Sequence, residues 1–214
     1  MGQLRLPAAL ATPDLGKAVS IVQDYLATAP TKPGGVAYTG SRFDTWDGGG
    51  DRKSVMNKFT DADITAVALL SVEIPPRAVI EILDRRRAAL TALLTTIPAD
   101  LDLEDAAPET IGPGSAASTA WHDLLAIKDV GWVTAGKLLA RKRPRLIPVY
   151  DQEVKKVVRA PKGRFWGSLQ EALAADDHAL AHRLRAIGRD AGAPRLSPLR
   201  VFDIVAWRVG KDGV

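Results

Sequence analysis

The chain of 214 residues contains no cysteine. This absence excludes disulfide bonds, thiolate zinc sites and iron–sulfur clusters held by cysteine. No apolar run approaches the roughly 20 residues needed to span a bilayer. The N-terminus also lacks the charged flank, apolar core and cleavage site of a signal peptide. We therefore expect a soluble, cytoplasmic, monomeric protein that has no membrane partner.

The net charge of +4 is modest, but its distribution along the chain is uneven. Residues 1–107 hold 11 Lys and Arg against 14 Asp and Glu, whereas residues 108–214 hold 18 against 11. Residues 141–164 alone contain nine basic residues and two acidic ones. Such a stretch favours contact with a nucleic-acid backbone through counterion release, and it is equally typical of a solvated helix face.

Apolar residues recur at helical spacing along most of the chain, which predicts an all-α protein. The helices expected before the most informative stretch cover residues 15–27, 61–72, 76–97 and 118–127. Those expected after it cover residues 168–175, 176–188 and 198–209. We predict two helical lobes with a cleft between them. One lobe comprises residues 1–58 and 151–214, including an aromatic loop at 36–51, and the other comprises residues 59–150.

The most informative stretch is Ile127 to Val158, where two predicted helices meet at the turn Asp129-Val130-Gly131. We expect this helix–hairpin–helix to cover about residues 118–141. The second helix presents unpaired backbone N–H groups at its start, and such an end binds phosphate. An ordinary helix–turn–helix packing unit is the alternative.

The segments VGWVTAGKLL and PVYD in this stretch resemble the hairpin and the following aspartate of the HhH-GPD superfamily of DNA glycosylases. The residues on the hairpin pattern are Ile127, Val130, Gly131, Thr134 and Ala135, and Asp151 falls at the family's catalytic aspartate. Asp129 replaces the usual first hairpin glycine. Val133 replaces the lysine that bifunctional members use as a nucleophile, so the resemblance implies base excision without strand cleavage.

The resemblance implies contacts between the hairpin region and the backbone of double-stranded DNA. The expected contact residues are Val130, Gly131, Thr134, Lys137, Arg141, Lys142, Arg143 and Lys155. We expect no cofactor, and a monovalent or divalent cation at the hairpin turn is the one candidate ion. No metal-ligating cluster is predicted.

A glycosylase must also flip its target nucleotide out of the duplex, which requires stacking surfaces and a wedge residue. The candidates are Tyr38, Phe43, Trp46, Glu73, Ile74, Trp121, His122 and Trp132. The aromatic residues of the loop at 36–51 stack on a base or anchor the loop to the core, and the sequence leaves both roles open. Glu73 and Ile74 follow an apolar helix that resembles the wedge-bearing region of the same superfamily.

The resemblance therefore implies a monofunctional DNA glycosylase in which Asp151 stabilises the sugar cation and orients a water molecule. The target base is open: uracil, alkylated or oxidised bases, mispaired adenine, and bulky phage-type bases all fit. The last of these would make the protein an antiviral defence factor rather than a repair enzyme. A non-catalytic helix–hairpin–helix DNA-binding protein is the main alternative, and a helical interaction protein is the third.

Overall fold

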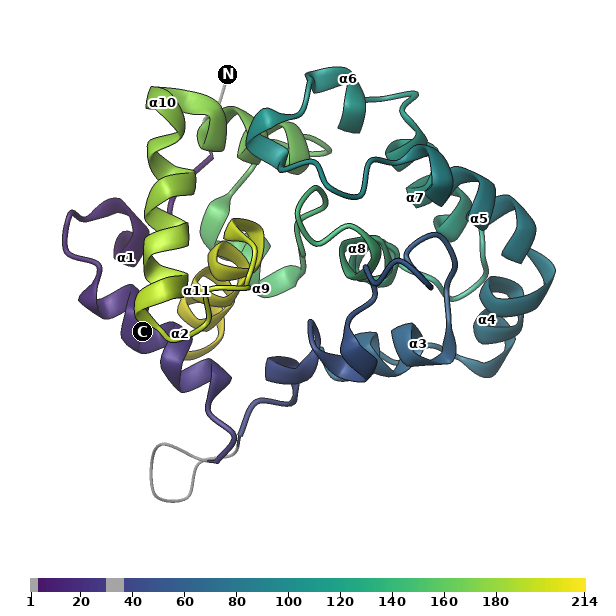
Figure 1. Cartoon of the computed structure of the whole chain (residues 1–214), viewed down its shortest axis with the longest axis horizontal. Helices are drawn as coiled ribbons and strands as arrows, with labels where there is room; N and C mark the ends of the chain where they lie inside the picture. The colour runs from purple at the N-terminus through teal and green to yellow at the C-terminus, as the bar shows by residue number, and fades with distance from the viewer. Residues whose placement is uncertain (1–3, 30–36) are drawn as a thin grey trace. The chain divides into compact units, whose positions relative to one another are not determined.

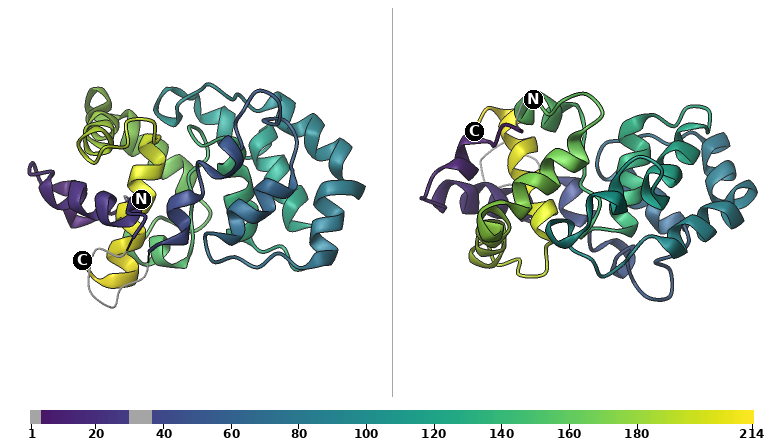
Figure 2. Two further views of the ribbon diagram at one scale, coloured as in Figure 1. Left: turned by 60° about the horizontal axis from the view of Figure 1, so that its bottom comes forward. Right: turned by 90° about the horizontal axis from the view of Figure 1, so that it is seen from above.

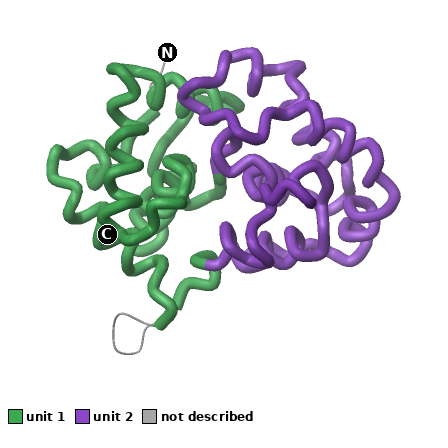
Figure 3. Tube along the Cα trace, in the orientation of Figure 1, with its two compact units in different colours: residues 1–41, 149–214 green, residues 42–148 purple. Residues whose placement is uncertain are grey.

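The computed structural model describes residues 4–29 and 37–214, and its regular structure there is entirely helical (Figure 1). The predicted all-α class is therefore confirmed. The chain divides into two compact units, residues 1–41 with 149–214 (unit 1) and residues 42–148 (unit 2) (Figure 3). Within the described ranges, no helix has both the length and the apolar character needed to cross a membrane.

The division differs from the predicted lobes mainly at one boundary. Residues 42–58 belong to unit 2 rather than with the chain termini, while the second boundary lies at 148 instead of 150. The first difference arises because buried cations of unit 2 bind residues 42–58. Residues 1–3 and 30–36 of the predicted terminal lobe, and with them Val36 of the predicted aromatic loop, lie outside the described residues.

Unit 1 is built around its last helix. Its helices are α1 (Ala8–Ala11), α2 (Gly16–Leu26), α9 (Gln152–Val158), α10 (Phe165–Asp190) and α11 (Pro198–Asp212), and the short turn η1 (Thr39–Arg42) ends at its boundary. Ser197 caps α11, whose residues 198–206 are all buried, and α11 packs against α2, α9 and α10. Non-helical backbone at 175–178 interrupts α10 where the sequence predicts a break between two helices.

A buried arginine of α11 ties the start of the loop after residue 37 to unit 1. Arg200 pairs with Asp203, and its guanidinium also donates to the Tyr25 hydroxyl at 3.2 Å and the Gly40 carbonyl at 2.9 Å. Tyr38 stacks on Tyr25 with ring centroids 5.2 Å apart. Irregular backbone at this position is therefore held by side-chain donors, as buried carbonyl groups require.

Unit 2 contains the hairpin. Its elements are η2 (Trp46–Gly48), α3 (Asp61–Ala68), α4 (Pro76–Ile80), the π-helical turn η3 (Glu81–Arg85), α5 (Arg87–Thr96), η4 (Leu103–Asp105), α6 (Pro108–Ile111), α7 (Ala116–Leu125) and α8 (Trp132–Lys142). The predicted single helix at 76–97 is thus split by η3. Helix α7 packs against α5 and α8, and α3 packs against α8 (Figures 1 and 2).

Three consecutive cations at the end of α8 form the polar centre of unit 2. Arg141 donates to the carbonyls of Phe43, Asp44 and Trp46. Lys142 donates to the carbonyls of Gly50 and Val55, each at 3.2 Å, and pairs with buried Asp63. Burial lowers the pKa of the Lys142 ammonium from its usual 10.5, and the neighbouring Asp63 carboxylate opposes that shift.

Arg143 likewise donates to carbonyl groups, including one near the end of the segment at residues 43–57. Its guanidinium donates to the carbonyls of Met56 at 2.7 Å and Ile97 at 2.9 Å, and to the Asn57 side chain at 2.8 Å. Residues 43–57 contain little regular structure, so their carbonyls need donors from elsewhere. The three cations supply these donors and attach the segment to unit 2.

The prediction that Lys137, Arg141, Lys142 and Arg143 contact a DNA backbone is therefore wrong. Their exposed fractions are 3%, 2%, 0% and 1%. Lys137 donates to the Leu70 carbonyl at 3.1 Å, and the other three bind the carbonyls described above. Each charge is committed to the interior of unit 2, so none is available to a phosphate.

Candidate functional site

The predicted hairpin is formed by α7, a turn at residues 126–131, and α8. Ser115 caps α7 by accepting from the Ser118 N–H at 3.0 Å. The apolar turn residues Ile127 and Val130 point into the core, and the Val130 N–H donates to the Ile127 carbonyl at 3.1 Å. Buried side chains therefore fix the turn and leave its other residues at the surface.

Asp129, at the hairpin turn, has a backbone conformation that favours glycine. Its φ is +67°, in the left-handed region that aspartate tolerates better than most residues. Gly131 is the exposed N-cap of α8, and a Cβ atom there would meet nothing within 4 Å. The first i→i−4 hydrogen bond of α8 joins the Ala135 N–H to the Gly131 carbonyl. The backbone N–H groups that precede that of Ala135 in α8 therefore lie at the positive end of the helix dipole.

Asp151, the predicted catalytic residue, is the N-cap of α9 in unit 1. Its Oδ1 atom accepts from the backbone N–H groups of Glu153 and Val154, both at 3.1 Å, and 8% of the residue is exposed. The preceding Tyr150 stacks on Phe165 with centroids 3.8 Å apart, and burial raises the pKa of its phenol. The Asp151 side chain is therefore held in one orientation by two backbone donors.

A glycine of α11 allows α9 to sit where it does. A Cβ atom at Gly210 would lie 2.5 Å from the Glu153 carbonyl oxygen and 3.0 Å from its carbon. Real Cβ atoms do not approach backbone this closely, so the first turn of α9 would have to move. Gly210 thus sets the position of the turn that orients Asp151.

We expect Gly210→Ala to lower the free energy of unfolding of unit 1 by about 1–3 kcal/mol, because it overpacks the α9–α11 contact. Gly167→Ala is the matched control, since Gly167 lies in α10 and a Cβ atom there meets nothing within 4 Å. That change should be neutral or stabilise by up to about 1 kcal/mol. Urea denaturation measures both, and a Gly210→Ala variant as stable as the control would contradict the close approach.

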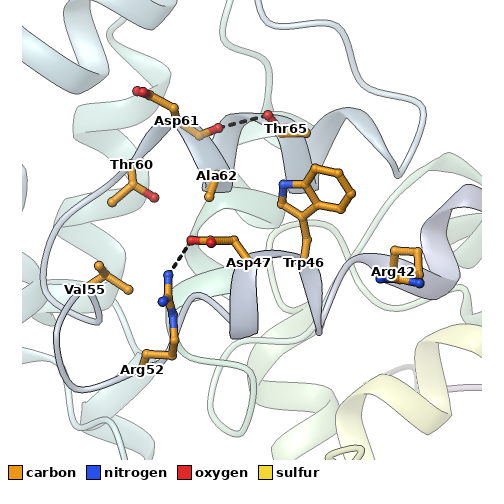
Figure 4. A pocket seen from close by; sticks show the side chains of 9 residues that line it. All are labelled: Arg42, Trp46, Asp47, Arg52, Val55, Thr60, Asp61, Ala62 and Thr65. Carbon is orange, nitrogen blue, oxygen red and sulfur yellow. Dashed lines mark hydrogen bonds and ion pairs between the residues drawn. The ribbon is translucent and has the colours of Figure 1, made fainter.

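A groove of about 630 Å³ lies on unit 2, between the loop around η2 and the start of α3 (Figure 4). The groove residues are Arg42, Trp46, Asp47, Arg52, Val55, Thr60, Asp61, Ala62 and Thr65. Helix α3 begins with a capping box, in which the Thr60 N–H donates to Asp63 Oδ2 at 2.8 Å. This groove lies within the size range of small-ligand sites.

The sequence profile of one protein family matches residues 18–210. The chain belongs to the family of unknown function DUF6308. No curated protein and no solved structure matches it. The matched range reaches from α2 to α11, so the DUF6308 pattern includes the hairpin, the groove and Asp151.

Two base-pocket candidates of this DUF6308 chain make structural contacts. The prediction is wrong for buried Phe43, and for half-buried Tyr38 it stays a prediction. Phe43 is 1% exposed and lies beneath Arg141 in unit 2. Tyr38 belongs to unit 1, where its ring contacts Tyr25 and Trp207 and its hydroxyl donates to Asp212 at 3.1 Å. Both anchor their segments, which is the alternative that the sequence leaves open.

Trp46 is the most exposed of the described aromatic residues of that loop, with 37% of it exposed. On α7, the rings of Trp121 and His122 meet edge to face, and the His122 Nδ1–H donates to the Ser118 carbonyl at 2.8 Å. Trp132 is half-buried at the start of α8, and Glu73 and Ile74 lie in the loop between α3 and α4. Roles for these residues in a base pocket or wedge stay predictions.

Among the expected backbone contacts, Lys155 is exposed on α9, Thr134 is buried, and Gly131 is exposed at the hairpin. The arginines of the groove, Arg42 and Arg52, were not predicted. The signal that could have found them is their placement in the sequence, on either side of the one loop tryptophan.

Proposed function

We propose that this DUF6308 chain is a monofunctional DNA glycosylase that removes a damaged or modified base and leaves an abasic site. The observation that carries the proposal is Asp151. It is a carboxylate fixed at the start of a helix by two backbone N–H groups, and it follows the hairpin in the order expected of the HhH-GPD superfamily.

The reaction passes through a sugar cation, so a fixed negative charge beside the anomeric carbon is the largest contribution that the protein can make. In the proposed mechanism Asp151 supplies that charge and orients the attacking water. Val133, half-buried in the first turn of α8, offers no amine to form a Schiff base. The product is then a free base and an abasic strand that stays intact.

DNA contact is proposed at two exposed elements. One is the α8 end of the hairpin, where Gly131 leaves space for a phosphate to approach the backbone. The other is the run from α9 to the start of α10, where Lys155, Arg159 and Lys162 are exposed. These exposed cations, rather than the buried Arg141 to Arg143, are the basic residues proposed to contact phosphates.

The carboxylate of Asp129 should weaken phosphate binding at the hairpin. We expect Asp129→Gly to tighten duplex binding by about 0.5–1 kcal/mol at low salt, which is roughly two- to fivefold, because it removes a like charge near the phosphate. Asp129→Asn removes the charge without changing the backbone, because asparagine also tolerates the left-handed conformation. It therefore separates the effect of the charge from that of the backbone conformation. Fluorescence polarisation with a labelled duplex at two salt concentrations measures both, and unchanged binding in both variants would place the DNA elsewhere.

A non-catalytic DNA-binding protein is the second candidate. Asp129 at the turn favours it, and so does the commitment of Asp151 Oδ1 to the cap of α9. It predicts duplex binding that is sensitive to salt, is unchanged or strengthened by Asp151→Asn, and is accompanied by no base release.

The proposed function is tested by incubating the protein with a panel of duplexes and searching for released bases by mass spectrometry. The panel contains uracil, alkylated and oxidised bases, adenine mispairs and bulky phage-type bases, and Asp151→Asn is run beside the wild type. Release of one base by the wild type alone supports the proposal. DNA binding without release from any duplex would support the second candidate, and absence of binding at low salt would exclude both.

A further inference from the structure

Trp46 is displayed at the surface of unit 2. Among the large hydrophobic side chains of the described residues, Trp46 and Ile80 are the two exposed ones, at 37% and 49%. Figure 4 shows the Trp46 ring rising from the loop beside Thr65, with the pair Asp47–Arg52 on one side and Arg42 on the other. An exposed tryptophan that lines a groove is a ready stacking surface for a planar ring.

Trp46 is exposed although hydrogen bonds hold the backbone of its loop in place. Arg141 donates to the Trp46 carbonyl, and Arg52 donates through Nε to the Gly49 carbonyl at 3.0 Å. Arg52 also pairs with Asp47 at 2.5 Å. Asp47, Gly48 and Gly49 all have positive φ, which is a costly conformation for the aspartate. The backbone is thus fixed from both sides while the ring is left at the surface.

The charged groups around the ring suit a nucleotide. Arg42 is exposed and forms no ion pair with any residue that the structure describes, and Arg52 is oriented by Asp47. A base stacked on Trp46 would have a cation on each side for its neighbouring phosphates, and the Asp47 carboxylate could accept from an amino group of the base. The groove has one aromatic ring rather than a cage, so it fits a flat ring better than an alkylated ammonium group.

We propose that this groove binds one unpaired nucleotide of a DNA strand, with its base on Trp46 and its flanking phosphates at Arg42 and Arg52. The inference rests on the proposed function in placing the chain on DNA, but it requires no catalysis. The helix α8 links the two elements, because its first turn belongs to the hairpin and Arg141 near its end holds Trp46. At about 1.5 Å per residue, this helix is roughly 16 Å long, which is close to five nucleotide steps of about 3.4 Å.

The two acidic residues of the groove, Asp47 and Asp61, balance the two arginines in charge. Stacking therefore supplies most of the affinity, and the dependence on salt should be shallow. Neutralising one phosphate contact changes the slope of log K against log salt by about 0.7 for single strands, so Arg42→Ala should reduce the slope by about that amount.

The test measures binding of a short single-stranded oligonucleotide to the full chain, by the chemical shift of the Trp46 indole N–H and by polarisation. Trp46→Ala should weaken binding roughly five- to a hundredfold, the range found for loss of one base–aromatic stack. Trp46→Phe keeps a ring and should retain most of the affinity. Ile80→Ala is the matched control, since it removes the other exposed hydrophobic side chain and should change nothing.

Single-strand binding that Trp46→Ala leaves intact would overturn the inference, and so would an indole shift caused by an arginine-rich peptide but not by the oligonucleotide. These results are independent of the proposed reaction. If the protein releases a base but Trp46→Ala does not change single-strand binding, the proposed glycosylase function is supported and the groove proposal is wrong. If binding depends on Trp46 but no duplex releases a base, the groove proposal is supported and the glycosylase function is wrong.

Discussion

Asp151→Asn should reduce base release by at least about 100-fold while leaving the fold intact. The reduction follows from the loss of a fixed negative charge next to a developing cation, which typically contributes two to three orders of magnitude. The fold is retained because asparagine caps helices about as well as aspartate. Its side-chain oxygen can still accept from the Glu153 and Val154 N–H groups that Asp151 binds. Single-turnover release and a thermal melt measure the two effects separately.

Asp151→Ala is the informative partner of that variant, because it removes the charge and the cap together. We expect it to lose base release to the same extent and to cost about 1 kcal/mol of stability. If the role of Asp151 is only structural, Asp151→Asn should keep normal activity and Asp151→Ala should lose it in proportion to stability. The pair therefore separates catalysis from capping.

Asp63→Ala should destabilise unit 2 by about 3–5 kcal/mol. Asp63 is 1% exposed and pairs with Lys142 and Arg141, whose exposed fractions are 0% and 2%. Removing it leaves two buried cations without their carboxylate, a situation that costs far more than the pair itself contributes. It also removes the capping box of α3, because Asp63 accepts from the Thr60 N–H and hydroxyl. Hydrogen exchange should show lost protection in α3, α8 and residues 42–58.

Two controls make this second result specific. Asp63→Asn can keep the capping interaction and should fall between wild type and Asp63→Ala. Glu171→Ala removes the exposed pair with Arg164 in unit 1, where side-chain exposures of 68% and 58% limit the cost to about 0–1 kcal/mol. Equal stability of Asp63→Ala and Glu171→Ala would show that the buried cluster does not hold unit 2 together.

The helices were predictable because helical periodicity and caps are local signals. The hairpin helices are found as α7 and α8, and the break in α10 falls where the sequence predicts that two helices meet. The division of the helix at 76–97 by η3 was missed, because a π-helical turn changes one hydrogen-bond register without changing the apolar pattern.

The burial of the three consecutive basic residues at 141–143 could not be predicted from their charge. Arg141 and Lys142 end α8, so their side chains point in directions about 100° apart, and Arg143 is the C-cap, whose backbone is no longer helical. The three side chains therefore do not share one solvated helix face. Where each charge ends depends on the irregular segment 43–57 packed against α8, whose need for donors is a tertiary property. The remaining basic residues are partly paired as well, Arg145 with Asp102 and Lys156 with Glu153.

Only part of the groove could be predicted from the sequence, for a similar reason. The sequence marks the loop as aromatic, but it does not tell which ring is buried. Phe43 and Trp46 are three residues apart, and the carbonyl bonds of Arg141 hold the segment with Phe43 inside and Trp46 at the surface. Exposure at Trp46 is thus decided by contacts from a helix almost a hundred residues later in the chain.

The most direct test of the central claim follows one labelled DNA strand that carries the base found in the panel search. With the wild-type protein, we expect the free base to appear and the strand to break only after alkali treatment, since Val133 offers no amine for strand cleavage. With Asp151→Asn, we expect neither. Strand breaks without alkali, or base release by Asp151→Asn at the wild-type rate, would contradict the account.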